Sequence, residues 1–189
     1  TTLFRSDTVP EMQTLVTAAN TALAKIEAYN NGNGTTPSAL TLQDYLDAGV
    51  TGVTASNLAA VNAKVLAAST GGADTVTEVQ TLVTAANNAI AKIEAYNNGD
   101  GTTPAALTVA DYQAAGITGV TNNNLAVVNA QVLAQSVGAA DTCPEVQALV
   151  TTVVAAFTAS LNAIATYAET GVTAPTVSDY NQVGVVGVT

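Results

Sequence analysis

Histidine and tryptophan are absent from the 189-residue chain, and it contains a single cysteine, Cys143. Without histidine there is no Ser–His or Cys–His catalytic pair and no His-ligated metal site. One cysteine cannot form a disulfide within the chain. Glutamates and aspartates recur at helix starts, where capping explains them better than acid/base chemistry does. We therefore predict that the chain is not an enzyme and needs no organic cofactor.

Positive charge is also scarce, with 4 Lys+Arg against 14 Asp+Glu and a formal net charge of −10. Nucleic-acid binding needs cationic side chains to replace phosphate counterions, so we expect no nucleic-acid partner. Thr, Asn and Gly interrupt every apolar stretch before it reaches about 18 residues, so we expect no membrane insertion. Hydrophobic residues still make up 48% of the chain. They are mainly small aliphatic side chains, which favour closely packed helices.

An internal repeat dominates the sequence. The pattern Asp-Thr-x-x-Glu-x-Gln begins at Asp7, at Asp74 and at Asp141, so its three copies are equally spaced. The first two copies are identical at about three quarters of their positions, and the third has diverged. Repetition at a fixed period of this size is typical of proteins built by stacking one supersecondary unit.

Each copy is predicted to contain three helices. The first begins at a capping box, Thr8 with Glu11, and its apolar residues follow at steps of three and four. The second, short helix starts after Thr41, and the third starts after Thr54, with Thr121 as the equivalent cap in the next copy. The predicted fold class is all-α: tandem three-helix-bundle repeats with a 67-residue period.

The third copy tests the helical interpretation. The interval from Asp141 to Tyr167 is longer than the interval from Asp74 to Tyr96 by about one helical turn. An insertion of one turn would leave the apolar stripe on the same face of the helix. We therefore expect Tyr167, like Tyr96 and Tyr29, to pack in the core with its hydroxyl in water.

Folding modules are expected to run from a second helix into the first helix of the next copy. This predicts complete three-helix modules at 41–100 and 101–170. It leaves the first helix of an incomplete module at 1–40 and the start of another at 171–189. Two incomplete edges indicate either that the chain belongs to a longer array or that neighbouring chains complete each other.

One loop is a candidate cation site. Asn97, Asn98 and Asp100 precede and alternate with glycine, and Asn30, Asn31 and Asn33 are their equivalents in the first copy. Oxygen ligands around a glycine bend suit a hard cation such as Ca²⁺. Asn-Gly is also ordinary turn chemistry, and the first-copy loop has no carboxylate, so a plain turn is the competing interpretation.

Cys143 has two interpretations as well. It aligns with Val9 and Val76 on the apolar stripe, which predicts a buried small hydrophobe. The alternative is a reactive thiol or one that pairs with another chain.

Three stretches carry a resemblance to known proteins: Asp44-Tyr-Leu-Asp-Ala-Gly-Val-Thr, Asn57-Leu-Ala-Ala-Val-Asn and Thr75-Val-Thr-Glu-Val-Gln-Thr-Leu-Val. They resemble the helical tandem repeats of very large bacterial cell-surface and biofilm adhesins. They are also similar, more distantly, to the albumin-binding three-helix module of Gram-positive surface proteins. The albumin-binding face of that module is rich in Lys, Tyr and Asn. Here only Lys64 is charged in the corresponding helix, so albumin binding is not carried over.

The resemblance implies an extracellular, cell-surface structural protein that acts as a filament, a stalk or an adhesin spacer. Its expected partners are itself or neighbouring repeats, in end-to-end self-assembly. The alternative is a binding module for a host or neighbouring-cell protein, which would require an exposed apolar or aromatic patch on one helix face.

Overall fold

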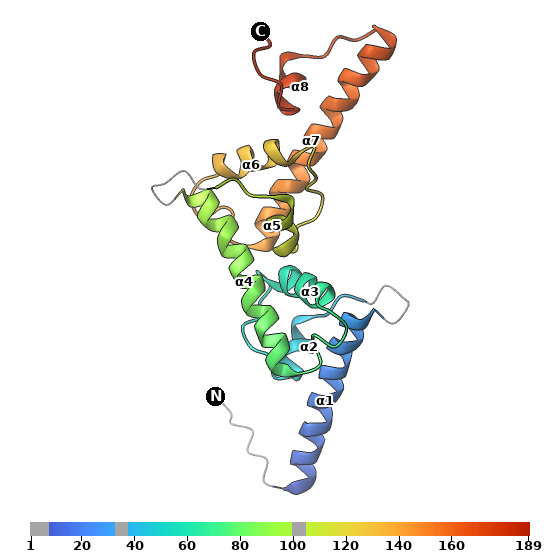
Figure 1. The fold of residues 1–189 in the computed structure, drawn as a ribbon, viewed down its shortest axis with the longest axis vertical. Coiled ribbons are helices and arrows are strands. Elements are labelled where there is room, and N and C mark those ends of the chain that lie inside the picture. The colour runs from blue at the N-terminus through green and yellow to red at the C-terminus, as the bar shows by residue number, and fades with distance from the viewer. Residues whose placement is uncertain (1–7, 33–37, 100–104) are drawn as a thin grey trace. The chain divides into compact units, whose positions relative to one another are not determined.

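The computed structural model describes residues 8–32, 38–99 and 105–189, and over these residues the chain forms eight α-helices and no β-strand (Figure 1). The all-α prediction is confirmed. The helices are α1 (Val9–Asn31), α2 (Leu42–Asp47), α3 (Leu58–Ala67), α4 (Val76–Asn98), α5 (Val109–Ala114), α6 (Leu125–Ala134), α7 (Cys143–Thr170) and α8 (Val177–Gln182).

Local chemistry fixes where the long helices begin and end. At the start of α1, the Thr8 side chain accepts a hydrogen bond from the Glu11 N–H, and the Glu11 carboxylate accepts one from the Thr8 N–H. α7 begins with the same reciprocal pair. Both helices end at a glycine in the left-handed conformation, Gly32 with φ 63° and Gly171 with φ 67°. The predicted capping boxes are confirmed.

The starts of α3 and α6 differ from the prediction. The expected caps, Thr54 and Thr121, lie too early in the chain, and the N-cap residues are Asn57 and Asn124. Oδ1 of Asn57 accepts a hydrogen bond from the Thr54 N–H at 2.7 Å, and its Nδ2 donates to the carbonyl of Gly52 at 2.8 Å. The asparagine closes a tight turn ahead of the helix, which delays the helix start.

The chain divides into two compact units, unit 1 (Thr1–Asn87) and unit 2 (Asn88–Thr189). The boundary falls inside α4, so the first half of that helix belongs to unit 1 and the second half to unit 2. The modules predicted at 41–100 and 101–170 differ from these two units, because each predicted module contains one long helix in full. α4 instead contributes its first half to the core of unit 1 and its second half to the core of unit 2.

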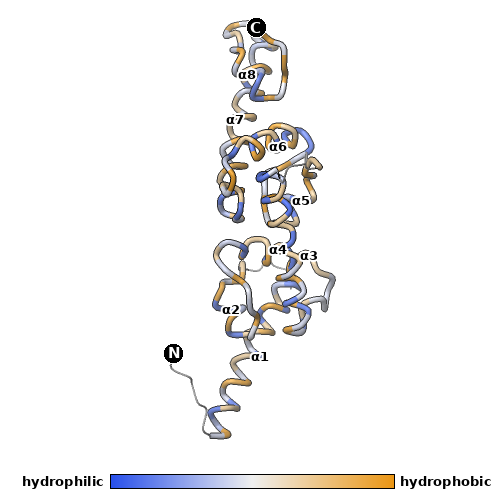
Figure 2. The backbone as a smooth tube through the Cα atoms, turned by 90° about the vertical axis from the view of Figure 1, so that its left-hand side faces the viewer, coloured by the Kyte–Doolittle hydropathy of each residue, from blue (hydrophilic) through white to orange (hydrophobic). Residues whose placement is uncertain are grey.

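In unit 1, the C-terminal half of α1 packs against both α2 and α3. The first half of α4 closes the same core. Its most buried hydrophobic residues are Ile26, Leu40, Tyr45, Ala60, Val61, Val65, Ala73, Val79, Val83 and Ala86. The N-terminal half of α1 runs on beyond α2 and α3 (Figure 1), and hydrophobic residues recur along it to its N-terminal end (Figure 2).

In unit 2, α7 contacts α6 through its N-terminal half and α8 further along. α7 has 28 residues, whereas α4 has 23, so the predicted lengthening is confirmed. The most buried hydrophobic residues of this unit are Ile93, Leu107, Tyr112, Ala115, Ile117, Val128, Val132, Val146 and Val150.

The prediction for Tyr167 is wrong. Its side chain is 39% exposed, whereas Tyr29 and Tyr96 are 8% and 4% exposed. The reason is where α8 packs: the hydroxyl of Ser160, which lies before Tyr167 on α7, hydrogen-bonds to Asp179 of α8. The longer helix therefore carries Tyr167 past α8 instead of keeping it on the packed face.

Candidate functional site

A side-chain amide joins the start of each long helix to the loop that precedes it. In unit 1, Oε1 of Gln80 accepts a hydrogen bond from the backbone N–H of Thr51 at 3.1 Å. Nε2 of Gln80 donates to the backbone carbonyl of Thr51 at 3.0 Å. The glutamine thus satisfies both polar groups of one residue in the loop between α2 and α3.

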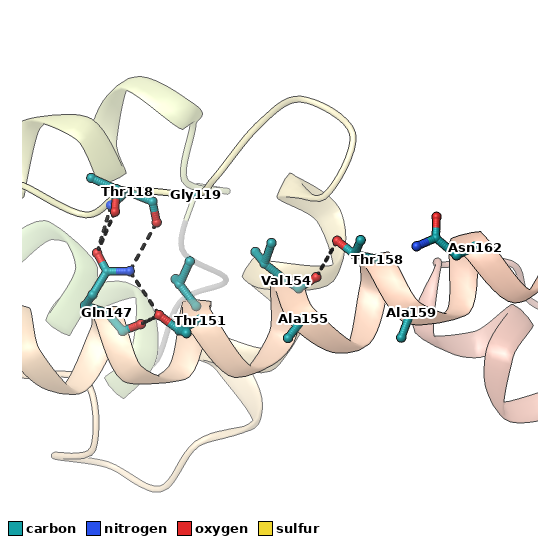
Figure 3. A pocket seen from close by; sticks show the side chains of 10 residues that line it. Thr118, Gly119, Gln147, Thr151, Val154, Ala155, Thr158, Ala159 and Asn162 are labelled. Atoms are coloured by element: carbon teal, nitrogen blue, oxygen red, sulfur yellow. Dashed lines mark hydrogen bonds between the residues drawn. The ribbon is translucent and has the colours of Figure 1, made fainter.

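Unit 2 has the same joint one repeat further along the chain (Figure 3). The Thr118 N–H donates to Oε1 of Gln147 at 2.9 Å, and Nε2 of Gln147 donates to the Thr118 carbonyl at 3.2 Å. One helical turn beyond each glutamine, a valine lies over a loop glycine. A Cβ placed on Gly119 would lie 3.9 Å from Val150 Cγ1, so loop and helix are in van der Waals contact.

Beside this joint, α7 and the loop between α5 and α6 line an open groove of about 590 Å³ (Figure 3). The residues that line it are Thr, Gly, Gln, Val, Ala and Asn. The hydroxyls of Thr151 and Thr158 donate to helix carbonyls of Gln147 and Val154. The surface of the groove is therefore largely apolar, and the hydroxyls of Thr151 and Thr158 are already engaged in hydrogen bonds. The residues that line it include no acid, base or nucleophile suited to catalysis.

A buried pair of neutral side chains links the short helices. The hydroxyl of Tyr45 in α2 donates to Oδ1 of Asn62 in α3 at 2.7 Å, and Tyr45 is fully buried. Nδ2 of Asn62 donates to the Leu40 carbonyl at 2.9 Å. In unit 2, Tyr112 and Asn129 form the same pair at 2.8 Å. Burial raises the pKa of both tyrosine hydroxyls well above the ordinary value, with nearby tyrosine and aspartate adding to the shift.

The residues proposed for calcium have structural roles where they are described. Nδ2 of Asn97 donates to the Val132 carbonyl at 2.8 Å, at the C-terminal end of α6, where helix carbonyls lack partners. Oδ1 of Asn98 accepts from the Gly138 N–H at 3.2 Å. Asp100 lies outside the described residues. These hydrogen bonds, by which asparagine side chains link α4 to the end of α6 and to the loop after it, were not predicted from the sequence.

The first-copy equivalents behave in the same way. Nδ2 of Asn30 donates to the Val65 carbonyl at 2.8 Å, and Oδ1 of Asn31 accepts from the Gly71 N–H at 3.2 Å. Asn33 lies outside the described residues. Oδ1 of Asn30 and of Asn97 is buried without a hydrogen-bond partner. No cluster of three Asp, Glu, Cys or His occurs among the described residues, and the calcium site stays a prediction.

One lysine and one aspartate in each of the first two copies form an ion pair in which the lysine side chain is exposed. Lys25 Nζ lies 2.6 Å from Asp44 Oδ1, and Lys92 Nζ lies 2.6 Å from Asp111 Oδ1. Burial raises the pKa of Asp44, but the hydrogen bonds from the lysine and from Thr41 outweigh it, and the pKa lies below its ordinary value. The sequence predicted only a first-turn capping role for these aspartates, because pairing with a lysine on another helix leaves no local signal.

Cys143 is 2% exposed, and its thiol donates to the Ala115 carbonyl at 3.2 Å. This confirms the prediction that the residue is buried on the apolar stripe. A reactive thiol needs access to solvent, so the buried position favours a packing role.

By length and composition, α7 is the one helix among the described residues that qualifies to cross a membrane. The expectation of no such segment was wrong for α7, because Thr and Asn interrupt its apolar residues without lowering its mean hydropathy enough to disqualify it. Only 22% of the most apolar window is buried. The N-terminal half of α7 nevertheless lies in the core of unit 2, where Cys143, Val146 and Val150 are almost fully buried.

No protein-family model matches the chain, and no curated protein and no solved structure is significantly similar to it.

Proposed function

We propose that the chain is a tandem array of a 67-residue, three-helix repeat that acts as a filament, stalk or adhesin spacer of an extracellular bacterial surface protein. The observation that carries the proposal is the recurrence of one set of contacts at this spacing. Gln80 with Thr51 recurs as Gln147 with Thr118, and Tyr45 with Asn62 recurs as Tyr112 with Asn129. Stacked repeats of this kind owe their stability to nearest-neighbour interfaces.

The chemistry of these contacts supports a structural role. They join neutral amides, hydroxyls and backbone groups, and the groove beside the Gln147 joint is lined by uncharged side chains. In this proposal α7 is a helix of the folded array and not a membrane span. Its capping box at Thr142 and its buried N-terminal half favour packing against α6.

Insertion of one further copy of residues 74–140 between 140 and 141 tests the proposal. The lengthened protein is expected to keep its ellipticity per residue, and a second insertion is expected to add the same increment to the maximum dimension in solution scattering. A control insertion of residues 88–140, which lacks the first half of α4, should disrupt folding. An in-phase insertion that unfolds the chain would contradict the array. Antibody labelling of intact cells, compared with lysed cells, tests the surface location.

The second candidate function is a binding module for a host or neighbouring-cell protein. The observation in its favour is the exposed apolar end of α7, where Leu161 is 47% and Tyr167 39% exposed. Exposed patches of this type mark interaction surfaces. Cell-surface display of the chain with Leu161→Asp and Tyr167→Asp separates the two functions, since loss of adhesion to host cells with unchanged folding supports binding.

A further inference from the structure

The N-terminal half of α1 carries an apolar face that nothing in the described structure covers. Met12 is 49% exposed, Leu15 61% and Val16 52%. The Gln13 side chain on the same helix has no hydrogen-bond partner among the described residues. Exposed apolar residues in this number along two turns of one helix mark a docking surface.

The equivalent faces of α4 and α7 indicate what fits this surface. Val79 and Val83 of α4 are at most 1% exposed, as are Val146 and Val150 of α7. The loop after α2 covers the face of α4, and the loop after α5 covers the face of α7. A Cβ placed on Gly52, in the loop after α2, would lie 3.7 Å from Val83 Cγ1. By position, Val16 corresponds to Val83, and Gln13 corresponds to Gln80.

A loop of the same backbone form follows α8, and α6 approaches only its start, where a Cβ on Gly184 would lie 3.5 Å from Val127 Cγ2. Gly184 and Gly187 have φ of 82° and 83°, as Gly49 and Gly52 have 81° and 78°. The Val185 N–H donates to the Tyr180 carbonyl at 2.9 Å, and the Val50 N–H donates to the Tyr45 carbonyl at the same distance.

The contacts that cover the other two loops are missing from this one. A Cβ placed on Gly187 would have nothing within 4 Å, in contrast to Gly52 and Gly119. Val185 is 44% exposed, whereas its equivalents Val50 and Ile117 are 3% and 2% exposed. Residues 185–187 are therefore open to a helix start, whereas Gly184 lies against Val127 of α6.

We propose that the N-terminal half of α1 docks onto residues 185–187 of a second copy of this chain. Gln13 then hydrogen-bonds to the backbone N–H and carbonyl of Val186, and Val16 packs on Gly187. The inference rests on the proposed function, because it takes the contact between neighbouring repeats as the template. The two surfaces differ, so the interface is head-to-tail and each added copy leaves one of each surface open.

Val186 replaces the threonine found at the equivalent positions 51 and 118. The replacement removes one hydrogen bond of the joint, from the threonine hydroxyl to the glutamine Oε1, and keeps the two that use main-chain atoms. The docking lacks the equivalent of α6, which contacts α7 in unit 2. The association is therefore weak, with the average mass rising between about 10 µM and about 1 mM.

Sedimentation equilibrium of the 189-residue chain tests the inference with three variants. Val16→Asp disrupts the docking face of α1, and Val185→Asp disrupts the loop that receives it. Thr14→Asp is the control: it adds the same charge to α1 at a position whose equivalent in α4, Thr81, is exposed. We expect the unaltered chain and Thr14→Asp to grow beyond dimers. Val16→Asp and Val185→Asp alone should each stay monomeric.

An equimolar mixture of Val16→Asp and Val185→Asp provides the decisive measurement. Each variant retains the surface that the other lacks, so the mixture should form a heterodimer that grows no further. Gln13→Glu, at an exposed position, should weaken association about tenfold without affecting helical content. Association of Val185→Asp alone would overturn the head-to-tail interface in favour of α1 pairing. A monomeric unaltered chain at about 1 mM would overturn the inference, and successful in-phase insertion would still support the proposed function.

Discussion

Residues 13–20 in α1 and residues 80–87 in α4 have the same sequence, Gln-Thr-Leu-Val-Thr-Ala-Ala-Asn, and both are helical. Their environments differ, since Val83 is 1% exposed and Val16 is 52% exposed. The loop at residues 49–53 accounts for the difference, because it covers α4 and has no described counterpart on α1. The same eight-residue sequence therefore forms a helix with an apolar face in both places, but that face is buried only where another element packs on it.

The largest expected effect comes from charge placed at the two equivalent valines. Val83→Asp buries a carboxylate without a partner, so we expect the free energy of unfolding to fall by more than about 3 kcal/mol. Val16→Asp should change it by less than about 0.5 kcal/mol at concentrations where the chain is monomeric. Denaturant titration followed by circular dichroism measures both. Equal losses would show that the two helix halves are buried alike.

The next largest effect concerns the buried Tyr45–Asn62 pair and the equivalent tyrosine of α8, Tyr180. Tyr45→Phe leaves Oδ1 of Asn62 buried without a donor, which should cost about 1–3 kcal/mol. Tyr180→Phe is the matched control, since Tyr180 is only partly buried and its hydroxyl has no described partner. That change should cost less than about 0.5 kcal/mol. Thermal unfolding of both variants at neutral pH measures the difference, and a costly Tyr180→Phe would contradict it.

A smaller effect should separate the two glutamines. Gln80→Ala removes three hydrogen bonds to Thr51 at a solvent-accessible joint, so we expect a loss of about 1 kcal/mol. Gln13→Ala removes no described hydrogen bond and should be neutral in the monomer. Hydrogen exchange at the Thr51 amide gives a local measurement, and unchanged protection in Gln80→Ala would rule out the joint as a source of stability.

The smallest effect is electrostatic. Lys25→Met removes the exposed ion pair with Asp44, which should cost between about 0.2 and 1 kcal/mol at pH 7. The pKa of Asp44 in the folded chain lies below its ordinary value of 3.8. The ion pair therefore stabilises the fold fully at pH values above 3.8. Its contribution is lost as the pH falls through the folded pKa. The difference between Lys25→Met and the unaltered chain should therefore vanish in acid. Lys64→Met, which removes a lysine without a described ion pair, should show no such convergence in urea titrations at pH 7 and pH 2.

The helices and their caps were predictable because the signals are local, such as Thr8 with the nearby Glu11. The start of α3 was placed too early, since Asn57 draws the backbone of Thr54 and Gly52 into a turn that propensity alone does not indicate. The exposure of Tyr167 depends on where α8 docks, which is a tertiary property. The glutamine joint was also missed, because Gln80 reaches a residue in a loop far from it in sequence.

The glutamine joint also affects how such a sequence can diverge. Gln80 and Gln147 pair with the peptide groups of Thr51 and Thr118, and the exposed threonine hydroxyls add one longer hydrogen bond each to the same glutamine oxygens. Position 186, equivalent to 51 and 118, carries a valine, which retains the peptide groups but has no hydroxyl. A joint of this kind keeps two of its three hydrogen bonds when the loop side chain changes, so the outward-facing residue can vary while the helix stays attached to the loop.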